Sequence, residues 1–199
     1  MDHHHHDESP GDLSSMAASA TLHCLTGCAI GEVSGLVIGT ALGLATGWTI
    51  ALAVALAFFF GYLLSTLPLV RTGVGVLAAL SVVFAADTLS IATMEVVDNV
   101  VMALIPGAMD SGLVSPIFWI SMPIALAVAF VAAYPVNRYL LGRGKGHALT
   151  HEFHGRSAAG GWRRFVPELT TGILVAAIAA FFLGGLVVSV AADLGVAAH

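Results

Sequence analysis

The sequence predicts an all-α fold, a polytopic transmembrane helix bundle of about five spans. Hydrophobic residues make up 58% of the 199 positions and charged residues only 10%, and the mean hydropathy is +0.93. These values exclude an ordinary water-soluble globular domain. Long apolar stretches recur along the chain, and each can cross about 30 Å of hydrocarbon as a helix of about 20 residues.

Residues 1–16 precede the first apolar stretch and are predicted to form a disordered tail. They contain His3 to His6 among acidic, serine, proline and glycine residues. The tail lacks the basic start and short apolar core of a cleaved signal peptide, so we expect the first helix to be retained. The histidine run is either a cloning tag or a weak metal-collecting tract. The rest of the chain, 17–199, is predicted to be one membrane domain.

Five apolar runs are predicted as spans, with turn-forming residues between them. The breaks are expected at Gly47, at the Leu67 to Pro68 step, around Pro106 and in a polar loop that we place at 142–168. The third run is long for one span, so we expect it to be tilted, kinked or extended beyond the bilayer. The predicted spans are residues 17–44, 48–67, 74–105, 116–141 and 169–192.

The positive charges predict the orientation of the chain. Arg71 lies between the second and third runs, and the other six Lys and Arg residues lie in or beside the loop at 142–168. With five spans these two connections fall on the same side, which the positive-inside rule assigns to the cytosol. The N-terminus is then cytosolic and the C-terminus outside. Splitting the third run would give an even number of spans but would place Arg71 opposite the other charges.

The first run carries glycine at every fourth position. Such a stripe leaves one helix face without side chains and favours close packing on another helix, because small residues let backbones approach in lipid. The partner could be a helix of the same chain or a second copy, so a homodimer through the first helix is possible. The stripe consists of Gly27, Gly31, Gly35, Gly39 and Gly43.

The first run also carries chemically reactive side chains. Cys24, Cys28 and Glu32 are four residues apart and project from one helix face, with His23 directly before them. Two cysteines provide no disulfide framework, and alone they could be small hydrophobic core residues. A carboxyl group within a span is costly by about 2.5 to 3.5 kcal/mol and usually faces a cavity or a partner, so Glu32 is a candidate functional residue.

The third run supplies further acids and possible metal ligands. Three acids in one span have no Lys or Arg beside them, so within hydrocarbon they must be protonated, hydrated or bound to a cation. Alternatively, the extra length of the helix would lift the later two acids into the headgroup region. The polar and sulfur-bearing residues of this run are Asp87, Met94, Glu95, Asp98, Asn99 and Met102.

A second histidine cluster lies in the loop predicted to be cytosolic. If this segment is helical, His147, His151 and His154 share one face at a spacing suited to a transition metal. The alternative is an ordinary solvated loop. We treat these three residues as a secondary metal-site hypothesis.

Three segments resemble a bacterial membrane family catalogued as domain of unknown function 4396. They are the H-C-x-x-G-C-x-x-G-E signature at 23–32, the stretch at 86–99 and the stretch at 134–147. The resemblance implies a bacterial, multi-pass membrane protein, which we expect in the inner membrane. It implies importance for these motifs but no activity.

Together these features favour a protein that binds or moves a transition-metal cation, with copper or zinc as the expected ion. Thiol and thioether ligands favour Cu(I), or Zn with the thiols, whereas carboxylates suit harder ions. A membrane thiol redox protein using Cys24 and Cys28, or a non-catalytic assembly protein, is the alternative. We expect lipid but no nucleic acid as a partner, and binding rather than catalysis. The predicted ligands are His23, Cys24, Cys28, Glu32, Asp87, Met94, Glu95, Asp98 and Asn99.

Overall fold

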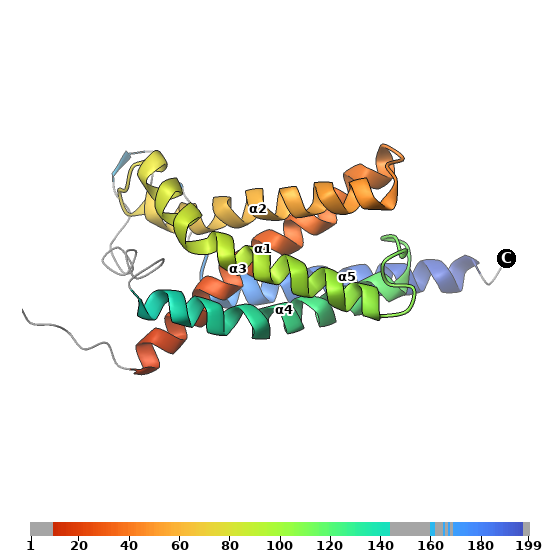
Figure 1. The fold of residues 1–199 in the computed structure, drawn as a ribbon. Coiled ribbons are helices and arrows are strands. Elements are labelled where there is room, and N and C mark those ends of the chain that lie inside the picture. The colour runs from red at the N-terminus through yellow and green to blue at the C-terminus, as the bar shows by residue number, and fades with distance from the viewer. Residues whose placement is uncertain (1–9, 144–159, 162–164, 166, 168, 197–199) are drawn as a thin grey trace, which may run out of the picture.

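The described part of the chain is built from long helices (Figure 1). In this computed structural model the described residues are 10–143, 160–161, 165, 167 and 169–196. Within them no strand is formed. The five helices are α1 (Pro10–Ala41), α2 (Thr46–Arg71), α3 (Val76–Leu104), α4 (Pro116–Gly142) and α5 (Thr171–Val196).

The lengths and composition of these helices confirm the predicted membrane bundle. Helices α1, α2, α4 and α5 are each long and apolar enough to cross a bilayer. The segments Val76–Ala85 and Asp87–Leu104 of α3 meet at a bend of 54° and make a fifth span if they cross the bilayer as one. The third run is therefore kinked, which was one of the three forms expected from its length.

Helix α1 begins earlier than the sequence predicts. It starts at Pro10 rather than at residue 17, so residues 10–16 are helical and not disordered. Proline is well tolerated in a first helical turn because its missing N–H has no partner there in any case. The polar composition of this segment excludes burial in lipid but does not exclude a helix. Residues 1–9, including the histidine run, lie outside the described residues.

Two predicted breaks lie elsewhere. The turn between α1 and α2 is at Gly43, which has a φ of +64°, whereas Gly47 belongs to the first turn of α2. Glycine adopts this left-handed conformation without steric cost. Helix α2 also continues through Pro68 to Arg71 rather than ending before the proline. Transmembrane helices tolerate such a proline because local adjustments satisfy the freed carbonyl groups.

The glycine stripe of α1 packs against α2 of the same chain. A Cβ at Gly27, Gly31 or Gly35 would overlap the backbone of α2, and one at Gly39 would overlap the side chain of Thr49. Gly43 does not belong to this contact, because nothing lies within 4 Å of its Cβ position. Since α2 occupies the stripe, the stripe is not free to serve as the seam of a homodimer.

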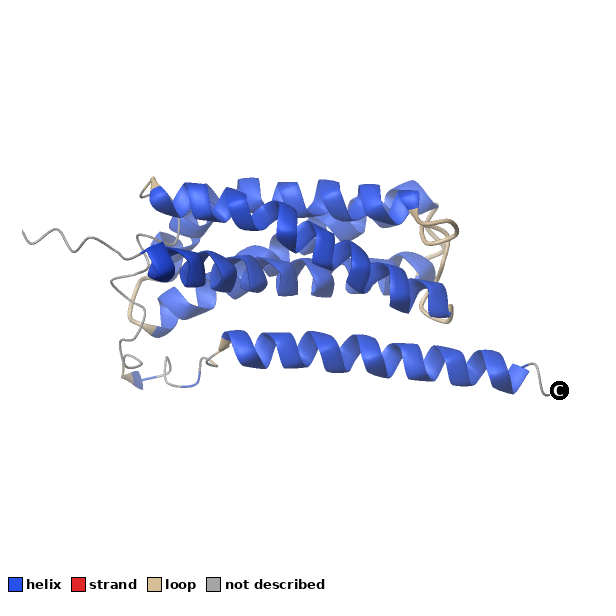
Figure 2. Cartoon of the chain, turned by 90° about the horizontal axis from the view of Figure 1, so that it is seen from below, coloured by secondary structure: helices blue, strands red, loops and turns tan. Residues whose placement is uncertain are grey.

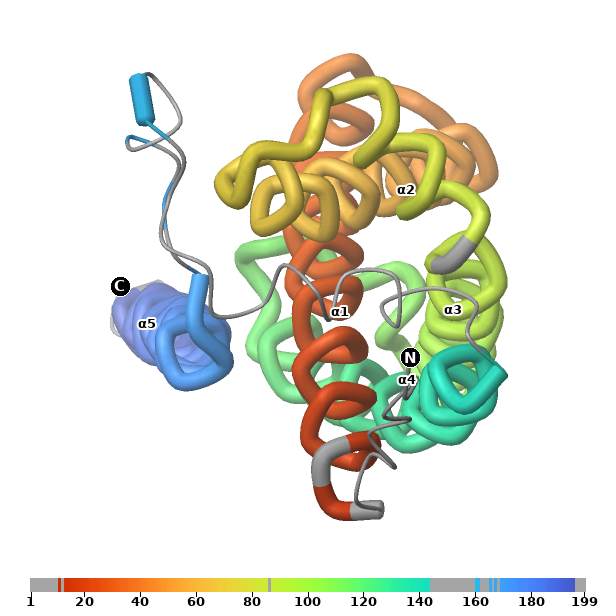
Figure 3. The backbone as a smooth tube through the Cα atoms, turned by 90° about the vertical axis from the view of Figure 1, so that its left-hand side faces the viewer, coloured from red at the N-terminus to blue at the C-terminus, as the bar shows by residue number. Residues whose placement is uncertain are grey.

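Helix α1 packs against each of the other four helices and forms the centre of the bundle (Figure 3). Helix α3 contacts α1, α2 and α4, and this arrangement brings the polar side of α3 against α1. Helix α5 lies beside the other four and contacts α4 and α1 (Figure 2). Trp119 of α4 packs on Phe181, Phe182 and Gly185 of α5, and its indole N–H donates to the carbonyl of Leu113 at 2.7 Å.

Candidate functional site

The thiols and carboxylate of α1 meet the acids of α3 inside the bundle. The thiol of Cys24 lies against the carboxyl group of Asp87, and its Sγ is 3.7 Å from the hydroxyl of Ser65 on α2. One helical turn further along, the thiol of Cys28 lies against Glu95. The α1 face predicted from four-residue spacing therefore faces α3.

Glu32 completes this row and forms an acid cluster with α3. Its carboxyl group interacts electrostatically with those of Asp98 and Glu95. The three side chains are only 4–5% exposed. Both oxygens of Glu32, both of Glu95 and Oδ1 of Asp98 are buried without a hydrogen-bond partner among the described residues. Burying polar groups without hydrogen bonds is costly. Five such oxygens at one place therefore indicate a binding site for a ligand.

The acid cluster lines a cavity of about 350 Å³ at the end of the bundle where α1 turns into α2. Glu32 and Glu95 each lie nine residues before the end of their helix, which places both about 14 Å below that end. The loop at 108–112 lines the same cavity, and with it Asp110. The described lining residues thus include four acids and no Lys, Arg or His. The helix ends that carry Arg71 and Arg143 are at the opposite end of the bundle.

Asn99 and Met102 add further ligand types to the cavity wall. The side-chain N–H of Asn99 donates to the backbone carbonyl of Glu95 at 2.9 Å, so the amide oxygen is the atom available for a ligand. Met102 is 6% exposed and lines the cavity together with Met109 and Met122. The chemistry of the wall is therefore mainly oxygen ligands with thioethers at its edge.

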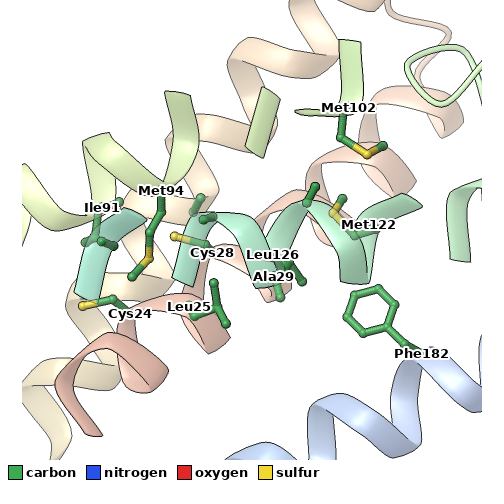
Figure 4. Packing of buried hydrophobic residues seen from close by; sticks show 14 of the residues in the cluster. Cys24, Leu25, Cys28, Ala29, Ile91, Met94, Met102, Met122, Leu126 and Phe182 are labelled. Atoms are coloured by element: carbon green, nitrogen blue, oxygen red, sulfur yellow. The ribbon is translucent and has the colours of Figure 1, made fainter. Parts of the chain in front are cut away.

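Behind the acid cluster, three sulfur atoms lie in the core between α1 and α3. Cys24, Cys28 and Met94 are 0–1% exposed and belong to one buried cluster. In Figure 4 the thioether sulfur of Met94 lies between the thiol sulfurs of Cys24 and Cys28. Both cysteines are free thiols. The predicted ligand set is thus divided into an acid group at the cavity and a sulfur group deeper in the bundle.

His23 has a structural role that the sequence did not indicate. Its Nδ1 is 2.8 Å from the carbonyl oxygen of Ser19, and its Nε2 is 3.0 Å from that of Leu169, just before α5. Each ring nitrogen therefore has a backbone carbonyl oxygen at hydrogen-bond distance, in the position that a metal ion would have to occupy. We remove His23 from the ligand set and regard it as a tether between α1 and the segment before α5.

Several polar contacts between helices, buried or part-buried, were not predicted from the sequence. Asn137 of α4 donates to Thr21 of α1 at 2.8 Å, in a fully buried contact. The hydroxyl groups of Tyr62 and Thr88 are 2.8 Å apart and join α2 to α3. Asn137 could have been found as an amide within an apolar run. Ser65 and Thr88 carry no such signal, because isolated hydroxyl groups are common in transmembrane helices.

Within the described residues, no group of three or more His, Cys, Asp and Glu side chains has an arrangement that could hold a metal ion. Any metal bound here would need other ligand types or a movement of side chains. The secondary site predicted from His147, His151 and His154 lies outside the described residues, so it stays a prediction.

The fold and this site define a class, a polytopic helical membrane protein with a buried acid cluster open to one end of the bundle. Over residues 14–146, more than half of its length, the chain matches the family described as a domain of unknown function (DUF4396), and it belongs to that family. This confirms the resemblance seen in the sequence. The match ends before α5. Comparison with curated proteins and with solved structures yields no match.

Proposed function

We propose that this protein binds a transition-metal cation inside the membrane and moves it across, with Glu32, Glu95 and Asp98 as the receiving group. Copper and zinc are the expected ions, and the inner membrane is the expected location. The observation that carries the proposal is the acid cluster itself: five buried carboxyl oxygens without a satisfied hydrogen bond belong to residues that line a cavity with no described basic residue.

The energetic argument follows from the cost of charge in a low-dielectric region. One ionised group in the centre of a span costs about 2.5 to 3.5 kcal/mol, and three adjacent acids also repel one another. A cation would satisfy the oxygens and remove the repulsion once the three side chains move to coordinate it, since their described arrangement holds no metal ion. Intramembrane acids that face a cavity commonly mark ion pathways. A purely structural role would leave the cost of the cluster without compensation.

The position of the cavity indicates the direction from which a cation arrives. It opens at the end of the bundle opposite Arg71 and Arg143. If the positive-inside rule holds, this end faces away from the cytosol. The opposite side of the acid cluster is closed by the tightly packed Cys24, Ile91 and Met94, which are 0–1% exposed. Transport therefore requires a second conformation in which this layer opens.

Zn(II) binding to the full-length protein in detergent tests the proposal. Glu32→Gln removes one carboxylate with almost no change in volume, and we expect it to weaken Zn(II) binding about tenfold or more. Asp110→Asn is the matched control, because Asp110 lines the same cavity but is exposed. All samples keep the same N-terminal histidines, so their contribution cancels. Equal affinities for wild type, Glu32→Gln, Glu95→Gln and Asp98→Asn would exclude the proposal.

The two alternative functions have less support. Cys24 and Cys28 are buried inside a continuous helix, where a redox partner has no access and the helix N-terminus cannot activate a thiol. An assembly protein would need packing surfaces but no acid-lined cavity. The metal proposal is the one that accounts for the cavity.

A further inference from the structure

We propose that Cys24, Cys28 and Met94 form a separate binding site for a soft monovalent cation, Cu(I). The two thiols share one face of α1, being four residues apart, and Met94 approaches from α3. Figure 4 shows the Met94 sulfur between the two thiol sulfurs. The site draws on two cysteines and one methionine, a combination that soft cations prefer.

The ligand number separates Cu(I) from zinc. Structural zinc sites are almost always four-coordinate and take Cys, His or carboxylate ligands. The sulfur group offers only two such side chains, Cys24 and Cys28, so a zinc site is incomplete at this place. Cu(I) accepts two thiolates and a thioether as a complete ligand set, because it is soft and tolerates low coordination numbers. The identity of the ligand atoms therefore selects the ion.

Polar groups lie beside the thiol protons that must be released when Cu(I) binds. Thiolates, not thiols, bind metals, so two protons must leave as one Cu(I) enters. The carboxyl group of Asp87 lies against Cys24, and that of Glu95 lies against Cys28. Two S–H bonds break, two S–Cu bonds form, and the two protons leave past these polar groups to the solvent. The copper keeps its oxidation state, and no oxidant or reductant is needed.

The sulfur site adjoins the acid-lined cavity through Glu95. Glu95 lines the cavity and also contacts Cys28, so a cation can pass from carboxylate oxygens to the first sulfur without crossing an apolar layer. The inference rests on the proposed function only for this route of entry. The sulfur site could bind Cu(I) even if the acid cluster had no role in transport, and the two proposals fail separately.

Competition with a chromophoric Cu(I) chelator, under anaerobic reducing conditions, tests the site in the full-length protein. The chelator removes copper from weak imidazole sites, so the signal reports thiolate binding. We expect one retained Cu(I) per chain in wild type. Cys24→Ser and Cys28→Ser should each weaken binding by on the order of a hundredfold or more, since even outer-shell changes cost about 10- to 100-fold. Met94→Leu should have a smaller effect of the same sign.

Controls separate this site from general loss of structure and from the cavity. Phe182→Leu reduces a buried side chain of the same core cluster, on α5 and outside both the sulfur site and the cavity lining, and should leave Cu(I) retention unchanged. Glu32→Gln should also retain Cu(I) while losing Zn(II) affinity. X-ray absorption of the copper-loaded wild type should show sulfur ligands only. Retention of copper by Cys24→Ser and Cys28→Ser, or none by wild type, overturns the inference while the cavity proposal stands on its own test.

Discussion

The carboxyl group of Glu32 on α1 faces that of Asp98 on α3, and each side chain is at most 5% exposed. This contact joins two helices through groups that repel each other when ionised. The glycine stripe packs α1 closely on α2, and α3 contacts both of these helices. Replacing either acid by its amide should therefore remove a repulsive interaction as well as a ligand.

Cation binding by the acid cluster should weaken as the pH falls. Protons and metal ions compete for the same carboxylate oxygens, so acidification lowers metal affinity by about tenfold per pH unit for each proton displaced. The Zn(II) affinity of wild type, measured between pH 8 and about pH 5, should fall more steeply than that of Glu32→Gln, which has one proton fewer to displace. Identical slopes for the two proteins would place Glu32 outside the binding site.

Adding a methyl group at Gly31 should separate α1 from α2. A Cβ there would overlap the backbone of Ala57, which cannot move aside as a flexible side chain could. We expect Gly31→Ala to cost about 1 to 3 kcal/mol, visible as a lower thermal midpoint in detergent. Gly47→Ala is the control, because nothing lies within 4 Å of that Cβ position. Equal thermal midpoints for the two variants would show that the close contact between α1 and α2 is incorrect.

The neighbouring glycines of α5 should respond differently to the same change. A Cβ at Gly185 would overlap the indole ring of Trp119, whereas one at Gly184 meets nothing within 4 Å. Gly185→Leu should thus detach α5 from α4 and lower the thermal midpoint, and Gly184→Leu should have little effect. A cross-link between cysteines introduced on the facing sides of α4 and α5 provides a second measurement. Its formation in Gly185→Leu at the wild-type rate would contradict this packing.

The buried contact between Asn137 and Thr21 should be measurable as a coupling energy. Interhelical hydrogen bonds in membranes are worth about 0.6 kcal/mol on average and about 1.7 at most. A double-mutant cycle with Asn137→Leu and Thr21→Val should give a coupling within this range. The same cycle between Asn137 and Ser189, on α5, serves as the control because no hydrogen bond joins that pair. A coupling near zero for the first pair would mean that the hydrogen bond contributes nothing.

His23 should matter for the segment before α5 and not for metal binding. His23→Phe removes both contacts to the carbonyl groups of Ser19 and Leu169. We expect faster amide hydrogen exchange around Leu169 and unchanged Cu(I) and Zn(II) affinities. A loss of metal affinity in His23→Phe, with exchange unchanged, would restore His23 to the ligand set.

Much of the fold follows from local properties of the sequence. The five helices could be predicted because hydropathy and length are properties of each segment alone. The four-residue glycine spacing predicted a smooth helix face, and the spacing of Cys24, Cys28 and Glu32 predicted a common face. The helix ends were predicted less accurately near Pro10 and Pro68, where backbone conformation depends on the surroundings as well as on composition.

The sequence by itself determined the membrane class and the residues that a site could use. Only the tertiary structure decided which of them meet: Glu32 with Asp98, Cys24 with Asp87 and Ser65, and His23 with a carbonyl before α5. Such partners depend on the rotation and crossing of helices distant in the chain and on the bend in α3. The residue spacing within one helix predicts none of these. For the same reason the predicted ligand set became two groups, an acid cluster at the cavity and a sulfur group behind it.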